Sequence, residues 1–117
     1  MSIATSICKV SDLVPNTGAC ALVAGQQVAL FRVTEAEGDK FYAISNYDPF
    51  SKANVLSRGI VGSTKGRVMV ASPIYKQRFD LATGQCLDDE SIFLQSWNVH
   101  IENDCVYVES QARPAAA

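Results

Sequence analysis

The segment Phe41-Tyr-Ala-Ile-Ser-Asn-Tyr-Asp-Pro-Phe50 passes from a run of aromatic and branched residues into a polar turn that contains a proline. Aromatic and β-branched side chains favour strands, so residues 40–45 are predicted to form a strand and residues 46–58 a long loop. A second segment, Val70-Ala-Ser-Pro-Ile-Tyr75, ends a predicted strand over residues 67–71 and begins a second loop over residues 72–77. These two transitions from strand to loop decide which fold the sequence specifies.

Short apolar runs separated by turn residues surround these two segments. Such a pattern predicts β-hairpins, and Gly, Asn and Asp supply the conformations that tight turns need. The predicted hairpins join residues 19–24 to 28–33 across Gly25-Gln26-Gln27, residues 59–61 to 67–71, residues 78–81 to 85–87, and residues 97–101 to 106–108 across Asn103-Asp104. Helical turns are expected only at residues 11–13 and 88–93.

The fold class is therefore predicted to be all-β, an antiparallel β-sandwich or partly open barrel of about ten short strands with little helix. The chain has 117 residues and 48% of them are apolar, which is enough for one hydrophobic core. We expect residues 1–110 to form a single domain and residues 111–117 to be a disordered tail. No internal repeat is evident.

Charge and hydropathy exclude several functions. The net charge is −2 and the pI is about 5.2, whereas domains that bind nucleic acid are usually basic. No apolar run approaches the roughly 18 residues that a membrane-spanning helix needs, so we expect neither a nucleic acid nor a membrane as partner. The amino-terminal residues lack the basic and apolar regions of a secretory signal, and a cytoplasmic location is expected.

Residue types that commonly bind transition metals are few in this chain. The four cysteines, Cys8, Cys20, Cys86 and Cys105, contain no C-x-x-C pair and match no common zinc or iron-sulfur spacing. Free thiols are therefore expected, as in a reducing cytosol. The chain has one histidine, His100, which is expected to be a residue of a surface strand with no catalytic role.

The two loops carry a family resemblance. With their flanks they resemble the ligand loops of Rieske [2Fe-2S] proteins, in which C-P-H and C-P-x-H bind the cluster and an F-D-L-x-T-G turn follows the second loop. The four ligand positions of that family are occupied here by Asp48, Phe50, Ser72 and Tyr75. A Rieske cluster needs two thiolates and two imidazoles. We therefore expect this chain to bind no cluster, no other cofactor and no metal.

A subfamily resembles the chain at these positions as well. Residues 48–59 and 71–84 are similar to the D-P-F-S-x-A-x-V-L-S-R-G and A-S-P-[IL]-Y-K-Q-x-F-D-L-x-T-G loops of the Rieske-like small subunits of assimilatory NAD(P)H-dependent nitrite reductases. That resemblance implies an enzyme that reduces nitrite to ammonia, with FAD, an iron-sulfur cluster and siroheme in its large subunit. It implies that this chain binds and supports the large subunit and is not catalytic alone.

Two other functions were weighed. A free-standing Rieske-like binding module would hold a small anion or a partner protein through the same two loops. An electron-transfer ferredoxin is disfavoured because all four cluster ligands are replaced. Gel filtration with and without the large subunit discriminates between the accessory subunit and the free-standing module.

The loop residues allow a structural and a functional interpretation. Asp48 is expected first as a turn residue, because Asp-Pro favours turns, and Phe50 is expected to fill the volume of the absent cluster. Tyr75 is equally consistent with a docking residue and with a ring that folds inward. Residues 52–78 contain six basic and no acidic side chains. They either steer an acidic partner surface or a small anion towards the loops or are solvated residues on different faces. The candidate docking residues are Tyr47, Lys52, Arg58, Tyr75, Lys76 and Arg78.

Overall fold

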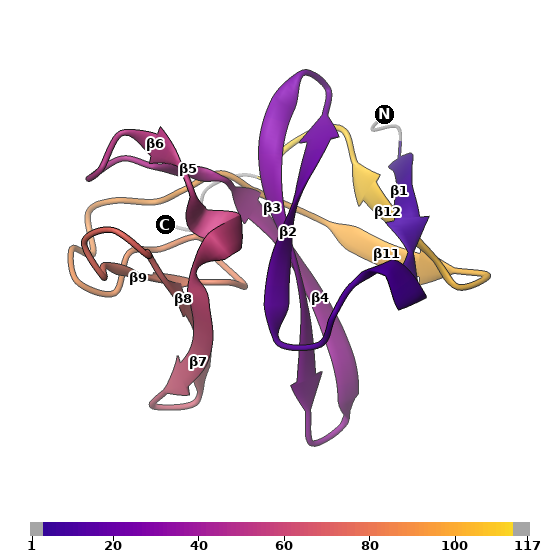
Figure 1. Cartoon of the computed structure of the whole chain (residues 1–117), viewed down its shortest axis with the longest axis horizontal. Helices are drawn as coiled ribbons and strands as arrows, with labels where there is room; N and C mark the ends of the chain where they lie inside the picture. The colour runs from indigo at the N-terminus through magenta and orange to yellow at the C-terminus, as the bar shows by residue number, and fades with distance from the viewer. Residues whose placement is uncertain (1–3, 114–117) are drawn as a thin grey trace.

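The computed structural model describes residues 4–113, which form an all-β fold and confirm the predicted class (Figure 1). Every strand pairing is antiparallel. The two helices, η1 (Val10–Asp12) and η2 (Leu56–Arg58), are single 3-10 turns. Nothing among the described residues forms a helix long and apolar enough to cross a membrane.

The strands within residues 4–113 form four sheets. The largest has the order β10-β4-β3-β2, a second has the order β1-β12-β11, a third has the order β7-β8-β9, and β5 pairs with β6. The strand bounds are β1 (Ala4–Lys9), β2 (Thr17–Val23), β3 (Gln26–Glu35), β4 (Gly38–Ser45), β5 (Tyr47–Asp48), β6 (Ala53–Asn54), β7 (Ile60–Thr64), β8 (Arg67–Ala71), β9 (Arg78–Asp80), β10 (Ser96–Trp97), β11 (Val99–Glu102) and β12 (Cys105–Glu109).

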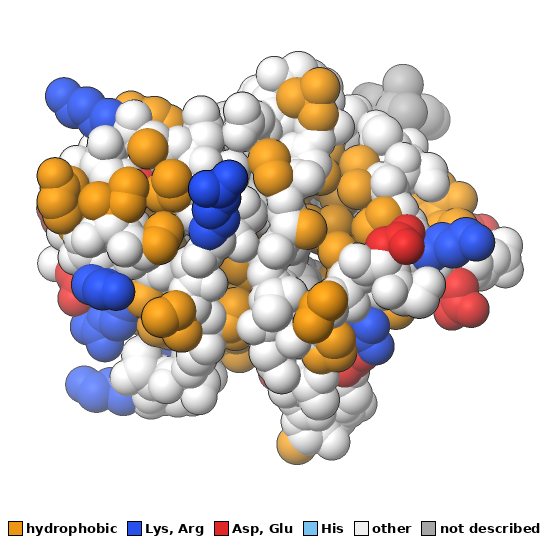
Figure 2. All heavy atoms as spheres, viewed as in Figure 1, with side chains coloured by type: hydrophobic (Ala, Val, Ile, Leu, Met, Phe, Trp, Pro, Cys, Tyr) orange, Lys and Arg blue, Asp and Glu red, His pale blue; other side chains and the backbone are white. Residues whose placement is uncertain are grey.

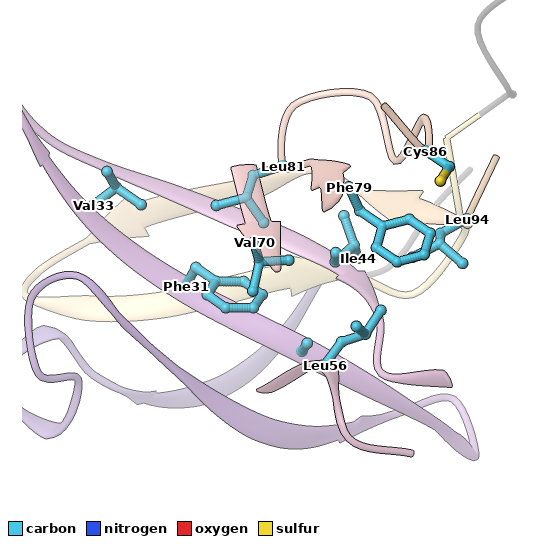
Figure 3. Close-up of a cluster of buried hydrophobic side chains, with 10 residues drawn as sticks. Phe31, Val33, Ile44, Leu56, Val70, Phe79, Leu81, Cys86 and Leu94 are labelled. Atoms are coloured by element: carbon cyan, nitrogen blue, oxygen red, sulfur yellow. The ribbon is translucent and has the colours of Figure 1, made fainter. Parts of the chain in front are cut away.

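The four-stranded sheet is covered on both faces. Side chains of β3 alternate between its faces, so Phe31 packs on one side and Leu30 on the other, and each is at most 1% exposed. The first side meets β8 and β9 in a core that contains Val70 and Phe79 (Figure 3). The second side meets β12 in a core that contains Val106, Val108 and Trp97. Two apolar clusters therefore hold three sheets together.

Several predicted boundaries were wrong in detail. Gln26 and Gln27 belong to β3 and not to the turn, because a two-residue turn at Ala24-Gly25 joins β2 to β3. Both turn residues have positive φ, at 50° and 81°, as the favoured two-residue hairpin turns require. In the hairpin of β7 and β8 the turn is likewise only Lys65-Gly66, and β7 extends to Thr64.

Two element predictions failed for local reasons. Residues 88–93 form turns, because the Asp89 carboxylate accepts hydrogen bonds from the backbone and the hydroxyl of Ser91 and so offers the backbone an alternative to a helix. Residues 85–87 are attached through isolated bridges and not through a regular strand. Strand β1 was not predicted, and it pairs with β12 through an irregular register between Ser6 and Cys8.

The first residues of the predicted tail contact the domain. The Arg113 backbone N–H donates to the Ser96 carbonyl at 2.6 Å, and its guanidinium donates to the Ala82 carbonyl at 2.9 Å. Ala112 packs against the second core. The remainder of the predicted tail, residues 114–117, lies outside the described residues.

The turn after β9 is predicted to depend on Gly84. This residue has φ +81°, and a Cβ built on it would overlap the Leu94 carbonyl oxygen. Gly84→Ala should lower the free energy of unfolding by about 1–2 kcal/mol for the left-handed backbone, plus about 1–3 kcal/mol for the steric overlap. Urea denaturation measures the sum.

Gly25→Ala is the matched control, since Gly25 has the same φ of +81° but no neighbour within 4 Å of the added Cβ. It should lose only the backbone contribution. Equal losses for the two variants would show that the contact with Leu94 does not limit this turn.

Candidate functional site

The two loops meet through a buried polar contact. The Ser72 hydroxyl donates to the Asp48 carboxylate, with 2.5 Å between Oγ and Oδ2. Both residues are at most 1% exposed. The loops that follow β4 and β8 therefore lie side by side at one end of the domain, as their resemblance to the Rieske loops implies, and Figure 1 shows β5, β6 and the β8–β9 connection on the same side.

The first loop is closed by Asp48 itself. Its side chain accepts a hydrogen bond from the Phe50 backbone N–H at 2.9 Å, and its carbonyl accepts one from the Lys52 N–H at 2.7 Å. The Ser51 hydroxyl donates to the same carboxylate at 2.9 Å. Lys52 has φ +57°, so the loop closes with a lysine in the left-handed region.

The second loop has the same local geometry. The Ser72 hydroxyl accepts from the Ile74 N–H at 3.3 Å, and the Ser72 carbonyl accepts from the Lys76 N–H at 3.2 Å. Lys76 has φ +67°. Both loops therefore follow one pattern, a polar residue, proline, two variable residues and a left-handed lysine. The two turns read D-P-F-S-K and S-P-I-Y-K.

Asn46 braces the first loop and was missed by the sequence analysis. Its side chain is 2% exposed. Its Oδ1 accepts from the Ser57 N–H at 2.7 Å, and its Nδ2 donates to Gln27 Oε1 and to the Asn54 carbonyl, each at 3.2 Å. The Leu56 N–H donates to the Asn46 carbonyl at 3.1 Å. The signal was an asparagine between a strand and a long loop, where its amide can bond the backbone.

The two aromatic residues at former ligand positions point in opposite directions. Phe50 packs against the first core, with its ring centroid 6.2 Å from that of Phe79. It thus occupies apolar space, as expected. Tyr75 is 60% exposed, which excludes the interpretation that its ring folds inward and leaves the docking interpretation.

The surroundings of Asp48 favour the ionised form of its carboxyl group. Burial alone raises the pKa of the Asp48 carboxyl, but hydrogen bonds from Ser72, Phe50 and Ser51 outweigh that effect and lower the pKa below its ordinary value. The Asp48 carboxylate thus accepts hydrogen bonds from its own turn and from the second loop. The turn interpretation of Asp48 is therefore correct, and the residue also joins the two loops.

The basic residues of the stretch 52–78 are not equivalent. Arg78 pairs with Asp88, with 2.9 Å between Nη2 and Oδ1, and the pKa of Asp88 is lowered chiefly by this hydrogen bond. The positive charge of Arg78 is therefore already offset within the chain. Within residues 4–113 no ion pair involves Lys52, Arg58 or Lys76, and all three are exposed.

Exposed apolar side chains lie beside these cations. Tyr47 is 42% exposed and Ile74 is 46% exposed. Figure 2 shows hydrophobic side chains gathered over the end that carries β5, β6 and β9, with Lys and Arg side chains at their margin. Ile74 was missed by the sequence analysis, although an apolar residue at the tip of a Ser-Pro loop was a usable signal.

The arrangement of sheets and the paired loops define a Rieske-like domain. Residues 4–109 match the family described as Rieske-like [2Fe-2S] domain. The chain is 45% identical over 101 residues to the nitrite reductase (NADH) small subunit of Salmonella typhimurium. The aligned residues cover 86% of this chain and 92% of that protein. The chain belongs to this small-subunit family.

Two further comparisons extend this result. The crystal structure of a putative NADH-dependent nitrite reductase small subunit from Mycobacterium tuberculosis superimposes with a TM-score of 0.86, at 41% identity and 99% coverage of both chains. The nitrite reductase [NAD(P)H] large subunit of Klebsiella oxytoca is 39% identical over 112 residues, which is 96% of this chain and 11% of that protein.

The residues present do not fit the [2Fe-2S] cluster that the family description names. The four ligand positions offer the Asp48 carboxylate, which already accepts from Ser72, the partly buried phenyl ring of Phe50, the Ser72 hydroxyl and the exposed phenol of Tyr75. Iron-sulfur clusters need soft thiolates, and in Rieske centres also imidazoles. His100 lies on β11, stacked on Tyr107 at 5.1 Å, and the described part of the chain contains no cluster of three His, Cys, Asp or Glu residues suited to a metal.

Ser72→Ala is predicted to destabilise the site. It removes the buried one of the donors to the Asp48 carboxylate, which keeps those from Phe50 and Ser51, and hydrogen bonds to charged groups are worth about 1.5–3 kcal/mol. We expect a loss of about 2 kcal/mol in the free energy of unfolding, measured by urea denaturation at neutral pH. Ser51→Ala, which removes a more accessible donor to the same carboxylate, should cost less. A Ser72→Ala variant as stable as the wild type would contradict the bridging role.

The stabilising effect of Asp48 is predicted to depend on pH. Because its pKa is lower in the folded than in the unfolded chain, its contribution is fully present above the unfolded pKa, about 3.9, and is lost as pH falls through the folded pKa. The difference in unfolding free energy between wild type and Asp48→Asn should therefore be constant from about pH 7 to pH 5 and shrink towards about pH 2.5. A difference that grows with acidity would refute this sign.

Proposed function

We propose that this chain is the accessory small subunit of an NAD(P)H-dependent nitrite reductase that reduces nitrite to ammonia. It binds and supports a large subunit that carries FAD, an iron-sulfur cluster and siroheme, and it contributes no redox centre of its own. The Asp48–Ser72 hydrogen bond carries this proposal, because it occupies the position where a Rieske domain would place two of its cluster ligands.

Membership of the small-subunit family supports association with a large subunit. In Klebsiella oxytoca a homologous domain is part of a polypeptide named as the large subunit. A covalent link gives two domains a high effective concentration. A separate chain has no such link and needs a surface that binds the partner. The four cysteines are unpaired, which fits a reducing cytoplasm, where we place this subunit.

We assign docking to the end of the domain that carries the two loops. This end exposes apolar side chains next to unpaired cations, whereas isolated exposed apolar residues elsewhere are ordinary. Of the docking candidates, Tyr47, Lys52, Arg58, Tyr75 and Lys76 are exposed there. Arg78 is less suited, because its charge is paired with Asp88.

The proposal predicts two results for the purified chain expressed with iron and sulfide. The isolated chain should contain no stoichiometric iron or acid-labile sulfide and should not reduce nitrite. Mixed with its cognate large subunit, it should elute in a complex on size-exclusion chromatography and increase or stabilise nitrite-dependent NAD(P)H oxidation.

Each result has a contrary outcome. A cluster detected by EPR after reduction would overturn the claim that the chain lacks a redox centre. Separate elution at micromolar concentrations of both chains, with no effect on turnover, would overturn the accessory role.

A further inference from the structure

Lys52 and Lys76 have a backbone conformation that does not suit a lysine. Their φ angles are +57° and +67°, in the left-handed region that glycine adopts without steric penalty and other residues adopt rarely. The loops need this conformation, because each lysine N–H bonds the carbonyl of the residue that opens its loop, Asp48 or Ser72. The closure requires only the backbone N–H. It does not require a lysine side chain.

The two lysines occupy equivalent positions in loops that are joined by the Asp48–Ser72 hydrogen bond. The same charged residue thus ends both loops, in a conformation where glycine would be the more stable choice. Strained residues that persist commonly serve a function. Both side chains are exposed and unpaired within the described part of the chain, so both ammonium groups are accessible to a partner.

The surroundings specify the chemistry of the partner. Ile74 and Tyr75 precede Lys76 and are 46% and 60% exposed. The stretch 52–78 contains no acidic residue, although the chain as a whole has a net charge of −2. An acidic protein surface with an apolar centre is complementary to this combination, since charges at a rim give specificity and association rate while buried apolar anchors give affinity.

We infer that Lys52 and Lys76 are paired charge anchors that bind two carboxylate groups of a partner protein, on either side of an apolar hollow that receives Ile74 and Tyr75. This inference rests on the proposed function, in which that partner is the large subunit. The left-handed backbone fixes the point at which each lysine side chain leaves its loop, and the flexible four-carbon stem lets each ammonium reach its carboxylate.

Glycine substitutions test the anchors without disturbing the fold. In the double variant Lys52→Gly/Lys76→Gly the backbone conformation is retained, and we expect thermal stability equal to or above that of the wild type. Calorimetric titration into the cognate large subunit should show affinity weakened by more than about tenfold. The dependence of the dissociation constant on salt should also become weaker.

Lys65 provides the matched control. It has φ +50° in the turn between β7 and β8, at the opposite end of β8 from Ser72. Lys65→Gly removes the same charge from the same backbone conformation and should leave the affinity unchanged. Lys52→Arg/Lys76→Arg, which keeps both charges, should bind within a few-fold of the wild type and thereby exclude a merely structural effect.

The outcomes separate this inference from the proposed function. If the wild type forms the complex and Lys52→Gly/Lys76→Gly binds equally well, the assignment of the two lysines as charge anchors is wrong. The accessory role then still stands. An equal loss for Lys65→Gly would also overturn the assignment, since it would show that only total charge matters. If the wild type does not bind the large subunit at all, the proposed function and this inference both fail.

Discussion

The buried hydrogen bond between the Asp48 carboxylate and the Ser72 hydroxyl constrains the functional end of this domain. A carboxylate removed from water must be bonded or it destabilises the fold, and here its donors come from both loops. The bond therefore fixes how the two loops lie relative to each other. With this contact in place, Phe50 is directed into the core, whereas Tyr75 remains at the surface.

The rest of the domain holds these loops at the ends of rigid strands. The first loop continues from β4, in a sheet buried on both faces, and Asn46 ties it to β3 and to the 3-10 turn that follows. The second loop joins β8 to β9, whose far end is stabilised by the Asp80 carboxylate, which pairs with Arg67 at 2.6 Å. A site built on such elements is more precise than one built on free loops.

The structure separates a fold from the chemistry that the fold often carries. Where a Rieske protein places thiolates and imidazoles, this chain places a carboxylate, a hydroxyl and two aromatic rings, of which three are used for packing or internal hydrogen bonds. The fold is kept and the residues at the ligand positions are not. Function on such a domain is argued from the site and not from the fold, and the site that we propose is an exposed surface with unpaired cations.

The sequence by itself determined the all-β class, most hairpins and the replacement of the cluster ligands, because alternating apolar residues, turn residues and ligand identities are local properties of the chain. Only the tertiary structure decided that Asp48 bonds Ser72, that Tyr75 points outward, and that Arg78 is paired whereas Lys52 and Lys76 are not. These outcomes depend on residues far apart in sequence, such as Asp48 and Ser72, which meet only when β4 and β8 are packed. The exposure of Tyr75 and the burial of Asp48 and Ser72 are likewise set by that packing.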